Sequence, residues 1–304
     1  MQFVNASFGR GQGLGNRLFP YARAFVYSQK HGIPMLAPSF AHIRKASFML
    51  GGIDYRKAFH KILLWDTFHF DPPFYKNGFL NKRHILSTYK KIEEPASLDT
   101  PVTEDHVLID FAMKHEFTSL IPYREMIGQE LRNITKDKWL NLLKDIPDYP
   151  IGMNIRLGND FRKAQSKDDF MNKGALKTPL SWFKESLLLI RQIKNSPVPA
   201  FIISDGTRSQ LKELLALPNV HFIETPTAMT DLFALSRCRL LLGSGGSSFS
   251  AWASFLGKMP TFSIYGQSFD WFKLSPSPDE HYVGTMDPDK PNEAEMEQIR
   301  LLSL

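Results

Sequence analysis

The chain has 304 residues, of which 43% are hydrophobic and 22% charged, a composition typical of globular proteins that excludes a disordered or fibrous protein. Its length suits two domains of roughly 150 residues each. The formal net charge of +6 favours an anionic partner, either a phosphate-bearing ligand or an anionic membrane surface, and no nucleic-acid-binding module is recognisable.

The sequence predicts a cytoplasmic location. The N-terminus lacks the pattern of a secretion signal, and no apolar stretch approaches the ~20 residues that a membrane span needs. Cys238 is the only cysteine, which excludes an internal disulfide and suits a reducing compartment. The basic stretch "NKRHILSTYKK" at 81–91 is read as a solvated face, with peripheral contact to the inner membrane face as the alternative.

The first half of the chain opens with a β-α-β pattern. Residues 2–8 and 33–37 are expected to be strands, and the apolar residues between them recur at the spacing of a helix face. Pro20 has no amide hydrogen to donate, so we expect this helix to begin close to Asn16 or Arg17.

The remainder of the first half is harder to assign. Residues 40–105 are rich in aromatic side chains without a clear period, and helical periodicity returns at about 120–144. We expect an N-terminal domain at 1–149, a C-terminal domain at 150–286 and a tail with a terminal helix at 287–304.

Strands and helices alternate in the second half, which predicts an α/β domain with a parallel sheet. The expected strands are 150–157, 199–205, 220–225, 239–244 and 259–264, and the expected helices are 179–195, 207–217, 228–238 and 247–257.

Polar residues follow three of these strands. Arg156 ends the first, Ser204 and Asp205 end the second, and "GSGGSSFS" at 243–250 leads from the fourth into a helix. Parallel α/β sheets bind ligands at the carboxyl ends of their strands. A guanidinium group and the free amides of a helix N-terminus both bind phosphate. The pattern predicts that Arg156 pairs with a bound diphosphate.

Two structural alternatives remain for these residues. Arg156 could form an ion pair with Asp160 or Asp205, and the serine-rich turn could be an ordinary helix cap. Common nucleotide and metal motifs are missing: the first strand is not followed by Gly-x-Gly-x-x-Gly, and neither a P-loop nor a zinc spacing occurs. We therefore expect a phosphate ligand with no cofactor and no bound metal.

Four segments resemble one enzyme family. "GLGNRLFPYA" (13–22), "NIRLGNDF" (154–161), "FIISD" (201–205) and "GSSFSAWASFLGKMP" (246–260) are similar in order and spacing to motifs of family 11 glycosyltransferases, the α-1,2-fucosyltransferases. The resemblance implies a GT-B-like fold: two Rossmann-like α/β domains with parallel sheets and a cleft between them. The C-terminal domain would hold the nucleotide-sugar donor, and the N-terminal domain would lie on the acceptor side.

The resemblance assigns roles to individual residues. Arg156 matches an arginine that holds the β-phosphate of the donor, and Asp205 matches an aspartate that contacts guanosine. The implied donor-binding residues are Asn154, Arg156, Ser204, Asp205, Gly246, Ser247, Ser248 and Phe249. The implied acceptor-side or cleft residues are Gly13, Gly15, Asn16 and Arg17.

The chain also departs from the family pattern. Asn154 stands for a histidine, Leu157 for a second arginine, Gly206 for a second aspartate, Gly246 for an asparagine, Ala251 for a tryptophan and Pro20 for a glutamine. These changes keep the residues expected to bind phosphate, but they leave the sugar and the linkage open.

The implied reaction is an inverting, metal-independent transfer of fucose from GDP-fucose to a hydroxyl of a glycan acceptor. Arg156 would stabilise the charge that builds on the leaving diphosphate. Asp160 is the first candidate for a catalytic base, with orientation of Arg156 as its alternative role. A lipid-linked acceptor at the inner membrane face is one candidate, and the oligomeric state is open.

Two other functions compete with this one. A transferase on the same fold could use GDP-mannose, GDP-rhamnose or UDP-xylose, which the changes at Asn154 and Leu157 allow. A non-catalytic carbohydrate-binding protein could also have kept the fold.

Overall fold

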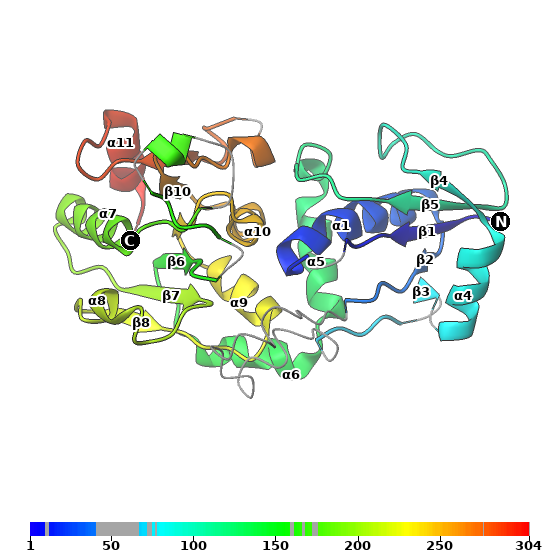
Figure 1. Ribbon diagram of the computed structural model, residues 1–304, viewed down its shortest axis with the longest axis horizontal. Coiled ribbons are helices and arrows are strands. Elements are labelled where there is room, and N and C mark those ends of the chain that lie inside the picture. Colours follow the sequence, from blue (N-terminus) through cyan, green and yellow to red (C-terminus); the bar gives the residue numbers. More distant parts are fainter. Residues whose placement is uncertain are drawn as a thin grey trace. The chain divides into compact units, whose positions relative to one another are not determined.

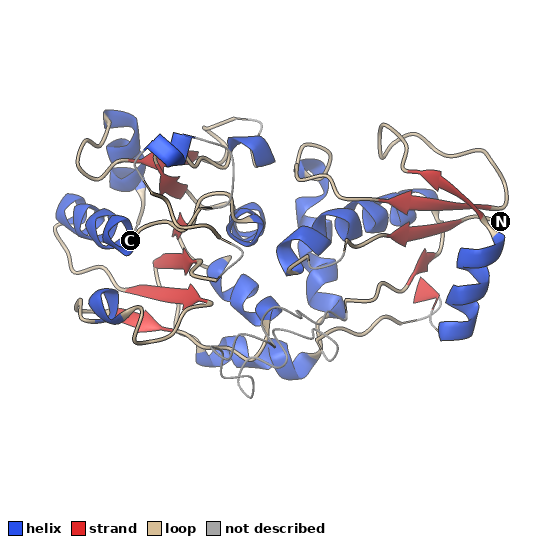
Figure 2. Cartoon of the chain, viewed as in Figure 1, coloured by secondary structure: helices blue, strands red, loops and turns tan. Residues whose placement is uncertain are grey.

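The computed structural model describes residues 1–9, 12–40, 67–71, 75–76, 78–158, 161–165, 168–171, 176–275 and 277–303. The chain divides into two compact units. The first unit comprises Met1–Asn141 with Pro226–Thr230, and the second comprises Leu142–Thr225 with Asp231–Leu304. Figure 1 labels the helices and strands of each unit, and Figure 2 distinguishes helices, strands and loops.

The first unit is built on a parallel sheet. Within its described residues the strand order is β3-β2-β1-β5-β4. The central strand pairs on both sides through Val4, which lies opposite Met35 and Ile109. The strands are β1 (Phe3–Ala6), β2 (Met35–Leu36), β3 (Tyr75–Lys76), β4 (Lys90–Glu93) and β5 (Val107–Phe111).

Helix α1 packs against this sheet and begins earlier than the sequence predicts. It runs from Leu14 to His31, because the Arg17 amide donates to the Gly13 carbonyl and closes a first turn ahead of Pro20. The other helices among the described residues of this unit are α4 (Phe79–Thr88), η1 (Ile121–Tyr123), α5 (Arg124–Ile134) and α6 (Asp137–Leu140), where η denotes a 3-10 helix.

The second unit has a larger parallel sheet, with the strand order β11-β10-β9-β6-β7-β8 among its described residues. The strands are β6 (Ile151–Ile155), β7 (Ala200–Ser204), β8 (Val220–Phe222), β9 (Leu240–Gly243), β10 (Thr261–Ile264) and β11 (Val283–Met286). All five neighbouring pairs are parallel, as the alternation of strands and helices predicts.

Helices cover both faces of the second sheet. One face packs its aliphatic side chains against α7, α8 and α11, while the other contacts α9 and α10 (Figure 1). The helices are η2 (Asn141–Asp145), η3 (Asp168–Met171), α7 (Leu180–Lys194), α8 (Lys212–Leu215), α9 (Ala228–Leu235), α10 (Ser248–Gly257), η4 (Asp270–Phe272) and α11 (Glu293–Leu301).

Most expected elements of the second half are present with shorter bounds, and α11 is the expected terminal helix. Among the described elements, those that the sequence did not predict are β3, α4, β4, β5, β11 and the 3-10 helices η3 and η4. The helices of the described residues lack the length and hydropathy that a membrane span requires.

Gly152 in β6 supports a test of how tightly the turn after α9, which contains Cys238, packs on the sheet. A Cβ at this position would lie 2.5 Å from the Cys238 Sγ, so Gly152→Ala should destabilise the protein by about 1–3 kcal/mol through overpacking. Cys238→Ala should recover most of that loss in the double variant, because it removes the atom that clashes. Urea unfolding of the wild type, the two single variants and the double variant measures the coupling between the two substitutions. Purely additive changes in the free energy of unfolding would contradict the proposed contact.

Candidate functional site

The candidate site lies at the carboxyl ends of three neighbouring strands of the second sheet. Asn154 of β6 lies opposite Gly243 of β9, and Ile155 lies opposite Ser204 of β7. The residues that follow these strands therefore emerge side by side. Arg156 follows β6, Asp205 follows β7, and the serine-rich turn follows β9.

Arg156 is held by both of its neighbours. Its amide donates to the Ser244 Oγ at 2.9 Å, and its Nη1 lies 3.1 Å from the Asp205 Oδ2. The guanidinium carbon also lies 5.3 Å from the ring centre of Phe161, within the range of a cation–π contact. The Arg156 side chain keeps 20% of its surface exposed.

Asp205 fixes two consecutive residues after β6. Its Oδ2 pairs with Arg156, and its Oδ1 accepts a hydrogen bond from the Leu157 amide at 2.7 Å. The Asp205 side chain is 27% exposed. The structure thus contains the Arg156–Asp205 ion pair, one of the two ion pairs that the sequence left open as structural alternatives for Arg156.

The turn between β9 and α10 is closely packed. A Cβ on Gly245 would lie 2.2 Å from the Gln267 Cβ, so only glycine fits there. Gly246 has a φ of 67°, in the left-handed region that glycine adopts readily and asparagine tolerates. The family's asparagine and this glycine therefore suit the same backbone conformation.

The turn opens α10 with free amides. Ser247 is the N-cap, and its Oγ accepts a hydrogen bond from the Ser250 amide. Among the described residues, the Ser248 and Phe249 amides donate no hydrogen bond. Both residues are partly exposed. These amides and the positive end of the helix dipole can bind an anion.

Asn154 has a different environment from the one the resemblance implies. Its side chain is buried, and its Oδ1 accepts a hydrogen bond from the Ser250 Oγ at 2.7 Å. Its carbonyl accepts from the Ser244 amide. Asn154 therefore connects β6 to the turn and to α10.

The structure thus brings together most of the expected donor-binding residues of the second unit: Arg156, Ser204, Asp205, Gly246, Ser247, Ser248 and Phe249. The candidate base, Asp160, lies outside the described residues. Ser244, Thr178 and Gln267 support the turn and were not identified from the sequence. Ser244 lies within the quoted "GSGGSSFS" stretch, so its composition signal was present.

The glycine-rich motif of the first unit forms the start of α1. Gly13 is the N-cap, and Gly15 is buried while Asn16 is partly exposed. The Arg17 guanidinium is buried and donates to the carbonyls of Gln12, Ser39 and Phe40, and burial lowers its pKa. Arg17 therefore ties α1 to the chain that follows β2.

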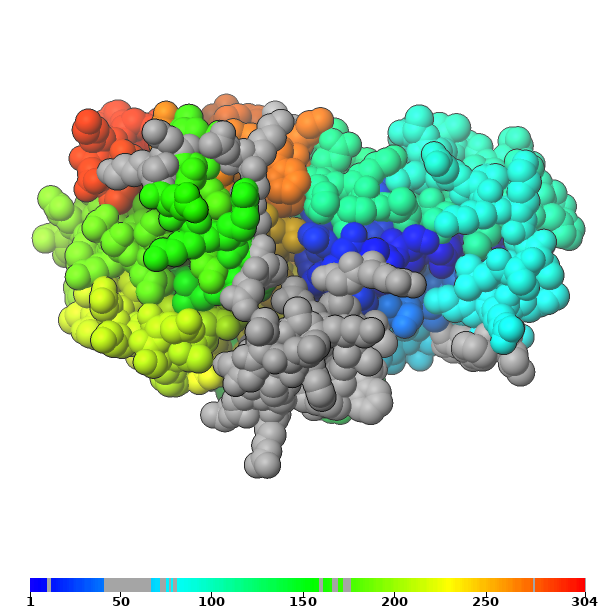
Figure 3. Space-filling model, in the orientation of Figure 1, coloured from blue at the N-terminus to red at the C-terminus, as the bar shows by residue number. Residues whose placement is uncertain are grey.

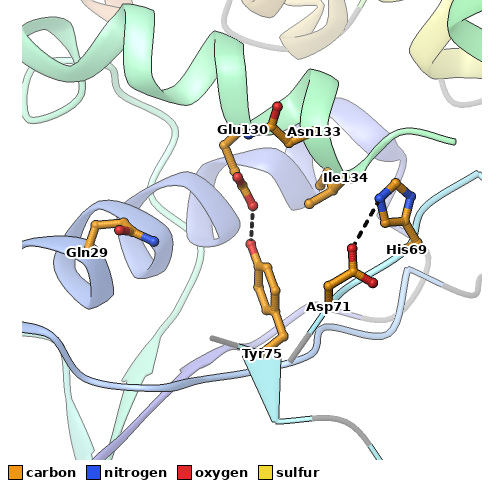
Figure 4. A pocket seen from close by; sticks show the side chains of 7 residues that line it. All are labelled: Gln29, His69, Asp71, Tyr75, Glu130, Asn133 and Ile134. Atoms are coloured by element: carbon orange, nitrogen blue, oxygen red, sulfur yellow. Dashed lines mark hydrogen bonds and ion pairs between the residues drawn. The ribbon is translucent and has the colours of Figure 1, made fainter. Parts of the chain in front are cut away.

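A separate depression of about 230 Å³ lies in the first unit (Figure 4). The Tyr75 hydroxyl donates a hydrogen bond to the Glu130 carboxylate, and the His69 Nε2 lies 3.6 Å from the Asp71 Oδ2. Burial raises the pKa of Glu130, whereas the Tyr75 hydrogen bond opposes that shift. The Tyr75–Glu130 pair joins β3 to α5, which suits a packing role for these two side chains. The depression is lined by Gln29, His69, Asp71, Tyr75, Glu130, Asn133 and Ile134.

In the described part of the chain, no three His, Cys, Asp or Glu side chains are grouped so that they could hold a metal ion.

The comparisons with known proteins agree with this architecture. No protein-family model matches the chain, and no characterised protein matches it by sequence. Its fold is similar to the crystal structure of NodZ alpha-1,6-fucosyltransferase soaked with GDP-fucose, with a TM-score of 0.53 and 14% identity over 86% of this chain and 94% of that chain.

Two further solved structures are similar. Fucosyltransferase NodZ from Bradyrhizobium gives a TM-score of 0.51 at 15% identity, over 87% of this chain and 96% of that chain. NodZ alpha-1,6-fucosyltransferase co-crystallized with GDP gives 0.50 at 15% identity, over 86% and 94%. The predicted fold class is confirmed: each unit is an α/β domain with a parallel sheet, as in GT-B fucosyltransferases.

Ser244→Ala tests the hydrogen bond that joins the end of β6 to the turn. Loss of the hydroxyl removes the acceptor of the Arg156 amide and should lower the free energy of unfolding by about 1 kcal/mol. Ser248→Ala is the matched control, because the described residues give its partly exposed hydroxyl no hydrogen bond, and it should change stability by less than about 0.5 kcal/mol. Equal losses in urea unfolding would argue against a specific role for Ser244.

Proposed function

We propose that the protein is an inverting glycosyltransferase that moves fucose from GDP-fucose to a hydroxyl of a glycan acceptor. The observation that carries this proposal is the meeting of Arg156 with the N-terminus of α10 at the carboxyl ends of neighbouring parallel strands. The fold similarity to fucosyltransferases and the motif resemblance to α-1,2-fucosyltransferases support it.

The donor diphosphate would bind between a guanidinium group and helix amides. Arg156 offers two parallel N–H donors that match phosphate oxygens, and the amides of Ser248 and Phe249 add neutral donors. A diphosphate carries more negative charge than the single carboxylate of Asp205. We expect Arg156 to turn part of its hydrogen bonding from Asp205 to the ligand, which frees Asp205 to accept from the nucleoside.

Asn154 is a positioning residue in this proposal. Its buried side chain is bonded to Ser250, so it acts on the donor through the placement of α10. Three other residues are positioning residues in the same sense. Ser204 bonds the chain that follows β7, and Gly246 and Ser247 set the backbone of the turn that follows β9.

The same groups would favour the transition state. As the bond to the sugar breaks, negative charge builds on the leaving diphosphate while the sugar becomes oxocarbenium-like. A fixed guanidinium and fixed amides directed at that charge stabilise it more strongly than they stabilise the bound donor. The acceptor hydroxyl attacks from the opposite side and loses its proton to a base, the role proposed for Asp160 from the sequence.

The acceptor side is proposed from the resemblance. Gly13, Gly15 and Asn16 at the start of α1 are the candidates, and the packing of Arg17 around this motif would hold them in place. Calorimetry with GDP, UDP and their sugars separates the competing donors. Binding of UDP in preference to GDP would favour the UDP-xylose alternative.

Arg156→Ala is the central test. It should weaken GDP binding at least tenfold in calorimetry and abolish transfer from GDP-fucose, because the guanidinium provides the charged contact to the diphosphate. Arg208→Ala is the matched control, since this exposed arginine of the same unit pairs with Glu224 instead. Full transfer activity in a folded Arg156→Ala protein would rule out the assignment.

Metal removal provides a further test. The proposed site balances the diphosphate with an arginine and helix amides, so transfer should keep its rate in EDTA and should not rise when magnesium is added back. Donor turnover with and without chelator measures this. A loss of activity that magnesium restores would show that the charge is balanced in another way.

A further inference from the structure

The side chain of Arg156 contacts an aromatic ring as well as a carboxylate. Its guanidinium carbon lies over the ring of Phe161, 5.3 Å from the ring centre, and its Nη1 lies 3.1 Å from the Asp205 Oδ2. A bound phosphate would compete directly with Asp205 because both are anions, whereas the neutral ring can keep its contact with the cation. The part of the chain around the end of β6, coloured bright green, reaches the surface of the second unit in Figure 3.

Phe161 is itself held in place. Its side chain is buried, and its amide donates to the Gly158 carbonyl at 3.2 Å, which keeps the residue close to the end of β6. The next residue, Arg162, pairs with Leu176, and its carbonyl accepts a hydrogen bond from the Lys177 amide at 2.7 Å. The ring below Arg156 is therefore anchored through its backbone on both sides.

The same segment contacts the turn that opens α10. Thr178 is buried, and its Oγ1 lies 3.4 Å from the Gly245 amide. The Phe170 carbonyl accepts a hydrogen bond from the Gln267 Nε2 at 2.8 Å, and Gln267 packs directly against Gly245. The chain between β6 and α7 thus contacts both groups that are proposed to bind the diphosphate, the guanidinium and the turn.

We infer that Phe161 is a positioning residue for diphosphate binding, because it keeps the Arg156 guanidinium in place while the ligand replaces Asp205 as its anionic partner. An arginine side chain has several rotatable bonds, and affinity is lost when binding must order it. A ring that contacts the guanidinium before and after binding reduces that loss. The inference rests on the proposed binding of a diphosphate beside Arg156, but it does not require fucose transfer.

A second pair of the same kind lies elsewhere in the unit and provides a control. The Arg208 guanidinium carbon lies over the ring of Phe222, 5.2 Å from its centre, and the Arg208 Nε lies 3.1 Å from the Glu224 Oε2. This arginine also has a ring and a carboxylate as partners. Phe222 ends β8, which β7 separates from β6 in the sheet, so its ring does not hold Arg156.

The first test compares ring variants in calorimetry with GDP. Phe161→Leu keeps an apolar side chain but removes the ring, so it should weaken GDP binding about three- to tenfold. Phe161→Tyr should stay within twofold of the wild type because a ring remains. Phe222→Leu should also stay within twofold, since the pair it disrupts does not involve Arg156. Urea unfolding verifies that each variant is folded, and Phe161→Met replaces the leucine variant if that protein does not fold.

A double-variant cycle separates positioning from packing. If Phe161 acts through the guanidinium, Phe161→Leu should change GDP affinity by less than twofold once Arg156→Ala is present. An equal loss in both backgrounds would overturn the inference, and so would unchanged GDP affinity in the single Phe161→Leu variant. A wild-type protein that does not bind GDP would contradict both this inference and the proposed function. The expected coupling without fucose transfer would support the role of Phe161 and count against the transferase alone.

Discussion

The hydrogen bond from the Arg156 amide to the Ser244 hydroxyl joins the two elements on which the candidate site depends. It fixes the end of β6 against the turn that opens α10, and the parallel register of β9, β6 and β7 places Asp205 beside them. Ser244 is fully buried, so this bond is protected from competing water. Together with the bond from the Ser244 amide to the Asn154 carbonyl and the bond between Asn154 and Ser250, it fixes the position of Arg156 relative to the start of α10.

The sequence predicted the second sheet well because its inner strands are buried on both faces and therefore read as continuous apolar runs. The strands that the sequence did not predict lie mainly at the edges of the sheets. Lys90–Glu93 reads "KKIE" and is largely exposed, so its pairing with β5 defines it as a strand, and Val283–Met286 is likewise an edge strand. The pairing partner of such a segment is distant in sequence, and its own composition gives little signal.

Sequence reasoning predicted which residues lie together where topology alone determines their positions. Arg156 and Asp205 follow neighbouring strands, so a general rule for parallel sheets was enough to bring them together. It was less complete for Asn154, because burial against Ser250 depends on how α10 packs. It also could not show that two departures from the family pattern share one contact. A Cβ on Gly206 would lie 2.5 Å from the Leu157 Cδ1, so glycine for aspartate and leucine for arginine change the same small region.

The Arg156–Asp205 ion pair orients Arg156 in the structure, and its small contribution to stability is compatible with the proposed exchange of Asp205 for a phosphate ligand. A partly exposed ion pair contributes about 0–1 kcal/mol, since solvent screens it and both side chains lose freedom. A ligand with two phosphate groups offers more charge and bidentate geometry, so the exchange of partners costs little compared with what the new contacts contribute. In the proposed complex, Asp205 would stay attached through its hydrogen bond from the Leu157 amide. The carboxylate that pairs with Arg156 would then lie beside the proposed ligand as an acceptor, so the ion pair in the structure is compatible with the proposed binding role.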